Sequence, residues 1–263
     1  MKLEGRKMSF FNKMLASIGI GAAKVDTKLY SERIRLGDEL KGVVEIVGGN
    51  VEQKIDEIYL TLYATYVVEV DDQKSTRHGV ISRWKITEPF TIGANERKEI
   101  PFSIELPLDT PISSGRTRVW LHTGLDIKNA IDPADEDYIK VEPTKVMNAL
   151  LNAVKSIGFR LRETECKQAS SYFRTRLPFI QEFEFVPVHG QFRGKLDEIE
   201  VIFFPLSQEE VEVLLQIDRR ARGLGGFLAE ALDLDESYVR FRISESDIPN
   251  LETKLVSLIQ KYC

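Results

Sequence analysis

Residues 55–70 read IDEIYLTLYATYVVEV, and this stretch decides the fold class. It is rich in isoleucine, leucine, tyrosine, valine and threonine, and apolar and polar residues partly alternate along it. This composition with a period of two is typical of a β-strand that buries one face. The polar run DDQKS at 71–75 then interrupts the pattern. The stretch therefore predicts a long strand that ends at a turn.

Similar strand-like runs lie on both sides of this stretch, with turn residues between them at a spacing typical of an antiparallel sandwich. A second series begins after residue 158. The sequence therefore predicts a mainly all-β protein made of two antiparallel β-sandwich domains. The strand-like runs are 40–47, 80–86, 89–92, 99–106 and 117–122 in the first half, and 159–167, 181–188, 196–204, 211–217 and 238–243 in the second.

Helical spacing interrupts the β pattern between the halves and again at the end of the chain. Apolar residues recur every three to four positions from Val146 to Val154, just after Pro143. Residues 247–262 predict a C-terminal helix with Asp247 as its N-cap. We therefore expect four parts: a polar leader or tag-like extension at 1–7, an N-terminal domain at 8–143, a linker helix at 144–157, and a C-terminal domain at 158–263.

Two segments align at an offset of 141 residues, 49–60 and 190–201. Glycine, lysine, aspartate, glutamate and isoleucine coincide in them, and a strand-like run precedes each. The shared unit is a strand, a turn at glycine and a second strand. A chance match in a β-rich chain is the alternative. The repeat favours two domains of one fold.

Composition limits the function classes. The chain has 263 residues and a net charge of −5, which gives no general attraction to nucleic acid. No apolar run approaches the roughly 20 residues of a membrane span, and a short amphipathic helix at 10–18 allows peripheral membrane contact at most. The two cysteines form no C-x-x-C pair, and no signal peptide is evident. We expect a cytoplasmic protein with free thiols.

No catalytic or cofactor motif is evident in the sequence. His78, His122 and His189 lie on separate segments without metal-ligand spacing, and Cys166 has no histidine near it in sequence. The glycines at 19–21 and 223–226 lack the Gly-Lys-Ser/Thr of a phosphate loop. The sequence therefore predicts a non-enzymatic protein without a cofactor.

Several segments resemble known families. Residues 36–44 (LGDELKGVV) and 100–107 (IPFSIELP) are similar to arrestin N-domains. From Met8 onward, the chain resembles the bacterial sporulation-control family, stage-zero protein M. The stretches that carry this resemblance are TGLDI at 123–127, DPAD at 132–135, PFIQEFEF at 178–185 and DRR at 218–220.

The resemblance implies two arrestin-like domains and no catalytic residues. It also implies a regulatory adaptor or scaffold that controls sporulation, with cell-cycle or division control as a further role. The partners implied are regulatory, division or cytoskeletal proteins, whose identity the sequence does not encode. Exposed edge strands of such sandwiches also offer a route to a homodimer.

Opposite charges gather on the two sides of the linker helix. Between 126 and 142 there are six carboxylates and two lysines, and between 155 and 176 there are six cations and two glutamates. By analogy with the buried polar core of arrestins, these groups predict an interdomain ionic latch; two separately solvated faces are the alternative. The latch residues would be Asp126, Asp132, Asp135, Asp137, Arg160, Arg162, Arg174 and Arg176.

The acidic cluster between Asp126 and Asp137 supports a second function. Carboxylate oxygens suit Ca²⁺, although the cluster lacks the glycine and the ligand order of an EF-hand. The alternative to the adaptor is therefore a calcium- or ligand-binding β-sandwich module. It requires these carboxylates to converge on one site.

Overall fold

The computed structural model describes residues 22–71, 73–127, 132–170, 175–219 and 236–263. In the first half, two sheets face each other. One sheet has the antiparallel order β1, β3, β7 and consists of β1 (Lys24–Leu29), β3 (Glu39–Val47) and β7 (Arg97–Glu105). The other consists of β2 (Arg33–Arg35), β4 (Gln53–Val70), β5 (Gln73–Lys85), β6 (Phe90–Ile92), β8 (Val119–Ile127) and β9 (Ala134–Glu142).

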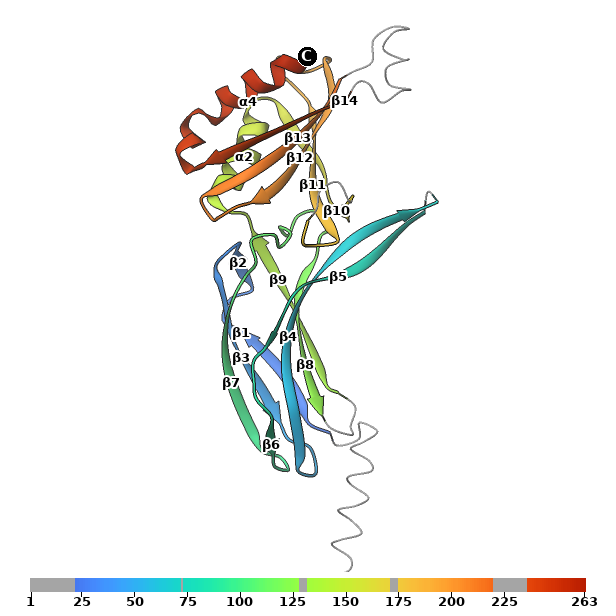
Figure 1. Cartoon of the computed structure of the whole chain (residues 1–263), viewed down its shortest axis with the longest axis vertical. Helices are drawn as coiled ribbons and strands as arrows, with labels where there is room; N and C mark the ends of the chain where they lie inside the picture. Colours follow the sequence, from blue (N-terminus) through green and yellow to red (C-terminus); the bar gives the residue numbers. More distant parts are fainter. Residues whose placement is uncertain (1–21, 72, 128–131, 171–174, 220–235) are drawn as a thin grey trace, which may run out of the picture.

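The long strand expected at 55–70 is β4, the centre of the second sheet. Ile58, Leu60 and Leu62 point into the core between the sheets and are fully buried. Their neighbours Tyr59 and Tyr63 lie on the opposite, outer face, as the period of a strand requires. Because β4 is much longer than the strands of the facing sheet, the β4–β5 hairpin extends beyond the sandwich toward the second half (Figure 1).

The second half contains one antiparallel sheet in the simple order β10 to β14. One face of this sheet carries helices α2 (Lys145–Ser156) and α4 (Leu251–Ile259), where a sandwich would have a second sheet (Figure 1). The strands are β10 (Phe159–Gln168), β11 (Phe179–Pro187), β12 (Leu196–Pro205), β13 (Glu210–Arg219) and β14 (Glu236–Ser244). The β-rich fold with a helix between the halves and another near the C-terminus is confirmed.

The apolar stripes of the two helices explain this layer. Val146, Leu150 and Val154 of α2 are buried, and so are Leu251 and Leu255 of α4. These side chains belong to the same continuous core as the strands. Two amphipathic helices therefore cover the sheet face that a second sheet covers in a sandwich.

Side-chain caps begin α2 and the 3₁₀ segment that precedes α4. The side chain of Thr144 accepts a hydrogen bond from Met147 N, at 3.3 Å, and starts α2. At the other helix, a 3₁₀ segment, η2 (Glu245–Asn250), precedes α4, and η3 (Gln260–Tyr262) follows it. Asp247 is not the N-cap: Ser244 is the N-cap of η2, Asn250 is that of α4, and Asp247 Oδ2 accepts from Ser244 N at 2.8 Å. Ser244 and Asp247 form a capping box.

The 141-residue repeat corresponds to different pairings in the two halves. In the first half, its flanking strands β3 and β4 belong to opposite sheets. In the second half, β11 and β12 pair with each other, with Phe183 opposite Val201. The shared strand, turn and strand are present, but they do not form the same structural unit. Similar local sequence thus occurs in two different tertiary settings.

Candidate functional site

The two halves meet where the β4–β5 hairpin reaches the second sheet. A parallel bridge pairs Lys167 of β10 with Val67 of β4, so hydrogen-bonded strands run from one half into the other. The ring of Phe179, at the start of β11, stacks on Tyr66 with ring centroids 5.1 Å apart. Gly79 of β5 lies against the same ring and leaves room for it. We call this region the junction.

An arginine from the second half clamps the junction. Arg176 donates to both carboxylate oxygens of Asp109, Nε to Oδ2 at 2.9 Å and Nη2 to Oδ1 at 2.5 Å. Its Nη1 donates to the carbonyl of Ile81 in β5, at 2.5 Å. The guanidinium therefore contacts two separate segments of the first half with matched geometry. The side chains of Arg176 and Asp109 are 53% and 38% exposed, so solvent reaches the pair.

A side-chain amide reproduces β-ladder hydrogen bonds across the same junction. Gln181 Oε1 accepts from Ile112 N at 2.8 Å, and its Nε2 donates to Ile112 O at 2.7 Å. The Nε2 group also lies 3.3 Å from Thr117 Oγ1. The amide thus satisfies a backbone segment of the first half from a strand of the second. This contact fixes the relative position of the two segments.

Hydroxyl and thiol groups make further polar contacts across the junction. Ser114 Oγ donates to Thr164 Oγ1 at 3.1 Å, and Thr117 Oγ1 lies 3.6 Å from Cys166 Sγ. Burial raises the pKa of the Cys166 thiol to about 12, so the sulfur stays protonated at neutral pH. A neutral, buried thiol is a poor nucleophile, so Cys166 has a structural role.

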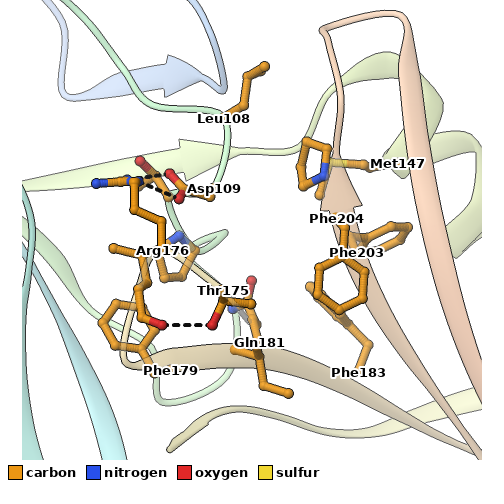
Figure 2. A pocket seen from close by; sticks show the side chains of 15 residues that line it. Leu108, Asp109, Met147, Thr175, Arg176, Phe179, Gln181, Phe183, Phe203 and Phe204 are labelled. Carbon is orange, nitrogen blue, oxygen red and sulfur yellow. Dashed lines mark hydrogen bonds and ion pairs between the residues drawn. The ribbon is translucent and has the colours of Figure 1, made fainter. Parts of the chain in front are cut away.

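A pocket of about 200 Å³ opens beside the ion pair (Figure 2). Loop residues after β7, including Leu108 and Pro111, line it from the first half. Phe183, Phe203 and Met147 line it from the second half, on the side away from Arg176 in Figure 2. The pocket therefore has walls from both halves, and most of its lining is apolar.

The arginines expected in the latch make different contacts in the structure. Arg176 does form an ion pair between the halves, but its partner is Asp109 and not the acidic cluster. Arg162 pairs with Glu184 and Glu198, which both belong to its own sheet. Arg160 is exposed on β10, and Arg174 lies outside the described residues.

The four carboxylates expected in the latch lie on both faces of their sheet. Asp126 and Asp132 line an open groove on its outer face, and Asp132 Oδ1 accepts from Ile127 N at 2.9 Å. Asp135 faces the opposite sheet and accepts from Thr27 N at 2.7 Å. Asp137 is its neighbour on the same face. Among the described residues, no ion pair joins these four to the latch arginines: Arg176 pairs with Asp109, and Arg162 pairs with glutamates of its own sheet.

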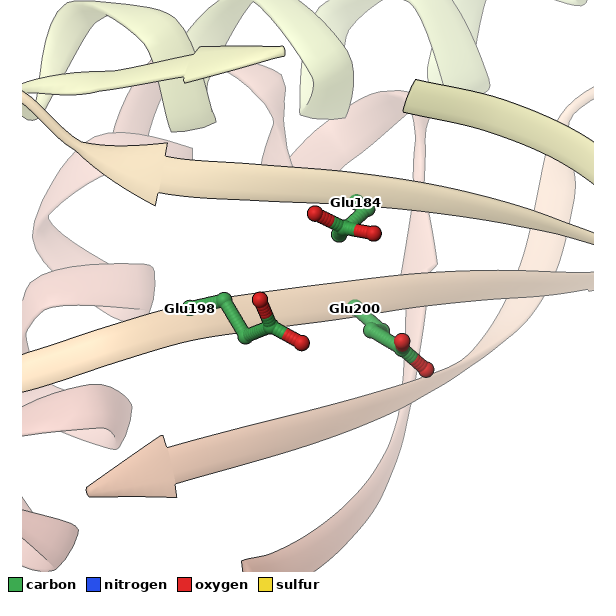
Figure 3. Close-up of side chains that lie close together, drawn as sticks. All are labelled: Glu184, Glu198 and Glu200. Atoms are coloured by element: carbon green, nitrogen blue, oxygen red, sulfur yellow. The ribbon is translucent and has the colours of Figure 1, made fainter. Parts of the chain in front are cut away.

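This division also affects the calcium alternative, because Asp126 to Asp137 do not converge on one site. In the described part of the chain, the group that approaches metal-ligand geometry is Glu184, Glu198 and Glu200 on the second sheet (Figure 3). Arg162 already pairs with two of these three glutamates and supplies a positive charge there. Within the described residues, the carboxylates of the acidic cluster are not arranged as a group of metal ligands.

The carboxyl group of Asp137 has an unusually high pKa. Burial, together with the charges of Asp135 and Asp26, raises the pKa of its carboxyl to about 6. Its Oδ2 atom is buried and has no hydrogen-bond partner in the described structure. Nearby, β1 contacts β9 through the bond from Thr27 N to Asp135 and contacts β8 through a 2.7 Å contact between the hydroxyls of Thr27 and Thr123. Several carboxyl groups therefore lie close together at a strand contact of the sandwich.

The described helices contain no segment long and apolar enough to cross a membrane. The amphipathic segment expected at 10–18 lies outside the described residues, so its role stays a prediction.

Comparison with known proteins agrees with the fold. The chain is 44% identical over 258 residues to the sporulation-control protein spo0M of Bacillus subtilis (strain 168), covering 97% of this chain and 99% of that protein. The crystal structure of Spo0M from Bacillus subtilis superposes with a TM-score of 0.83 at 42% identity, covering 93% of this chain and all of that one. Residues 11–221 match the family described as SpoOM protein. The chain therefore belongs to the SpoOM protein family.

Proposed function

We propose that this protein is a non-enzymatic, cytoplasmic adaptor that takes part in sporulation control through protein–protein contacts. The observation that carries the proposal is the junction, where a bidentate arginine and a ladder-like amide hold two differently built halves together. Loops and edge strands from both halves then form one composite surface for a partner. The name of the Bacillus subtilis relative supports the sporulation role.

The partners we propose are regulatory, division or cytoskeletal proteins. Nucleic acid is disfavoured by the net charge of −5. Among the described strands, β5 and β14 lie at edges of the sheet and are open to pairing with another chain. Strand β5 carries Lys74, Arg77, Arg83 and Lys85 and no acid. Antiparallel pairing of two β5 strands would bring like charges together, so β14 is the better edge for a homodimer.

A charge swap at the junction tests the proposal. Arg176→Asp places a second carboxylate beside Asp109, and we expect it to change the relative orientation of the halves in small-angle scattering. The double variant Asp109→Arg, Arg176→Asp restores opposite charges and serves as the matched control. Each form would be expressed in a Bacillus subtilis strain that lacks Spo0M, and spores would be counted.

The adaptor proposal expects wild type and the swap to restore sporulation, and Arg176→Asp to restore it poorly. Captured proteins from sporulating lysate should follow the same order. Failure of wild type to restore sporulation, or equal spore counts for all three forms, would contradict the proposal.

A further inference from the structure

The pocket at the junction has the size of one small ring system. Its volume is about 200 Å³, and an apolar cavity of about 150 Å³ is enough to hold a benzene molecule. A single ring or two fused rings therefore fit, whereas a drug-sized molecule does not. Figure 2 shows open space between Arg176 and Phe179 on one side and Phe183 and Phe203 on the other, with Leu108 of the first half at its upper end.

The lining favours an aromatic occupant over an aliphatic one. Phe183 and Phe203 meet edge to face, with centroids 5.6 Å apart and an interplanar angle of 69°. Phe179 also lines the pocket, and Met147 brings a thioether to it. Aromatic rings and thioether sulfur both gain energy from contact with a further ring in tilted or offset geometry.

The charged and amide groups that line the pocket are already paired, which favours an uncharged ligand; the exception among the polar groups is the buried Thr110 hydroxyl, which has no hydrogen-bond partner in the described structure. Arg176 is occupied by Asp109 and by the Ile81 carbonyl, and the Gln181 amide is occupied by Ile112. Thr175 Oγ1 donates to Leu177 O at 2.8 Å. A charged ligand would have to break one of these contacts before gaining its own. A neutral ring gains apolar contact and leaves them intact.

We propose that this pocket is a binding site for a free, uncharged aromatic compound of one or two fused rings. The ring lies between Leu108 of the first half and Phe183 and Phe203 of the second, so it contacts both halves at once. Occupancy therefore favours the closed junction over any arrangement in which these walls separate. This site does not depend on the adaptor function.

Indole is the probe, with cyclohexane as an aliphatic ring and decanoate as a charged chain. We expect saturable binding of indole to the full-length protein by calorimetry, with a dissociation constant on the order of 1 mM or tighter. Saturation-transfer signals should be weaker for cyclohexane and absent for decanoate. No saturable indole binding, or tighter binding of decanoate, overturns the proposal.

A filled pocket tests the location. Leu108→Phe adds a ring from a half-buried loop position of the lining and should weaken indole binding about tenfold or more. Leu206→Phe makes the same change at a residue that is 47% exposed and lies outside the pocket, and it should leave binding unchanged. Phe203→Leu keeps the pocket open but removes a ring, and it should reduce the preference of the site for indole over cyclohexane. Equal binding by Leu108→Phe and wild type places the site elsewhere and overturns the proposal.

Discussion

Asp137 offers a test of the electrostatics of the first half. Its pKa of about 6 in the folded protein compares with 3.8 for an ordinary aspartate. The folded state therefore holds this proton more tightly than the unfolded chain does, and folding stability falls as pH rises from about 4 through 6. The shift of about two units would correspond to about 3 kcal/mol for a fully buried group. Solvent screening of this half-buried carboxyl reduces the expected effect on the free energy of unfolding to about 1–2 kcal/mol.

Replacing Asp137 by asparagine removes the charge and keeps the shape of the side chain. We expect Asp137→Asn to match wild type near pH 3.5 and to exceed it by about 1–2 kcal/mol at pH 7.5. The assay is urea unfolding at several pH values, followed by tryptophan fluorescence. Both tryptophans, Trp84 and Trp120, belong to the first half, so the signal reports on the sandwich that contains Asp137.

The matched control is Asp126→Asn, which changes an exposed carboxyl on the outer face of the same sheet. It should leave the pH dependence of unfolding as it is in wild type. The reasoning would be refuted by an Asp137→Asn protein that is no more stable than wild type at pH 7.5. A gain of the same size at every pH would refute it equally, because that gain would not come from ionisation.

Two further predictions concern the junction. Gly79→Ala places a Cβ atom against the ring of Phe179, so that ring must shift; we expect a loss of about 1–3 kcal/mol in the free energy of unfolding and weaker protection of β5 amides in hydrogen exchange. Gln181→Leu keeps the bulk but leaves Ile112 N and O without partners, for a loss of about 1–3 kcal/mol in urea unfolding. A stability equal to wild type in either variant would contradict the contact it tests.

Much of the fold could be predicted from the periodic spacing of apolar residues in the sequence. The alternation in 55–70 identified β4, and the apolar stripe from Val146 to Val154 identified α2. The role of the helices in the second half could not be predicted from the sequence. An amphipathic stripe indicates that one face of a helix is buried, but it does not indicate what that face packs against. Only tertiary packing decides whether the helix takes the place of a second sheet.

The ionic contacts between the halves were only partly readable from the sequence. The sequence paired Arg176 with the acidic cluster, whereas in the structure it pairs with Asp109, which stands apart from that cluster in sequence. Long-range pairing of this kind leaves no signal in a single sequence. The division of the acidic cluster between the two faces of the sheet did leave a signal in the sequence. Asp135 and Asp137 alternate with Glu136 and Tyr138 along β9, so the two pairs lie on opposite faces. The separation of Asp135 and Asp137 from Asp126 depends on the register between β8 and β9, in which Asp135 lies opposite Thr123.

The exposure of Arg176 and Asp109 limits what their ion pair does. Exposed pairs contribute about 0–1 kcal/mol, and bidentate geometry places this one toward the upper end. The half-buried amide of Gln181 and the stacked ring of Phe179 contact the same junction away from solvent and contribute more. A partner that competes for Arg176 alone would therefore change the orientation of the halves without separating them. Separation requires opening the apolar contacts beneath, where the pocket lies, and a ring bound there would oppose it.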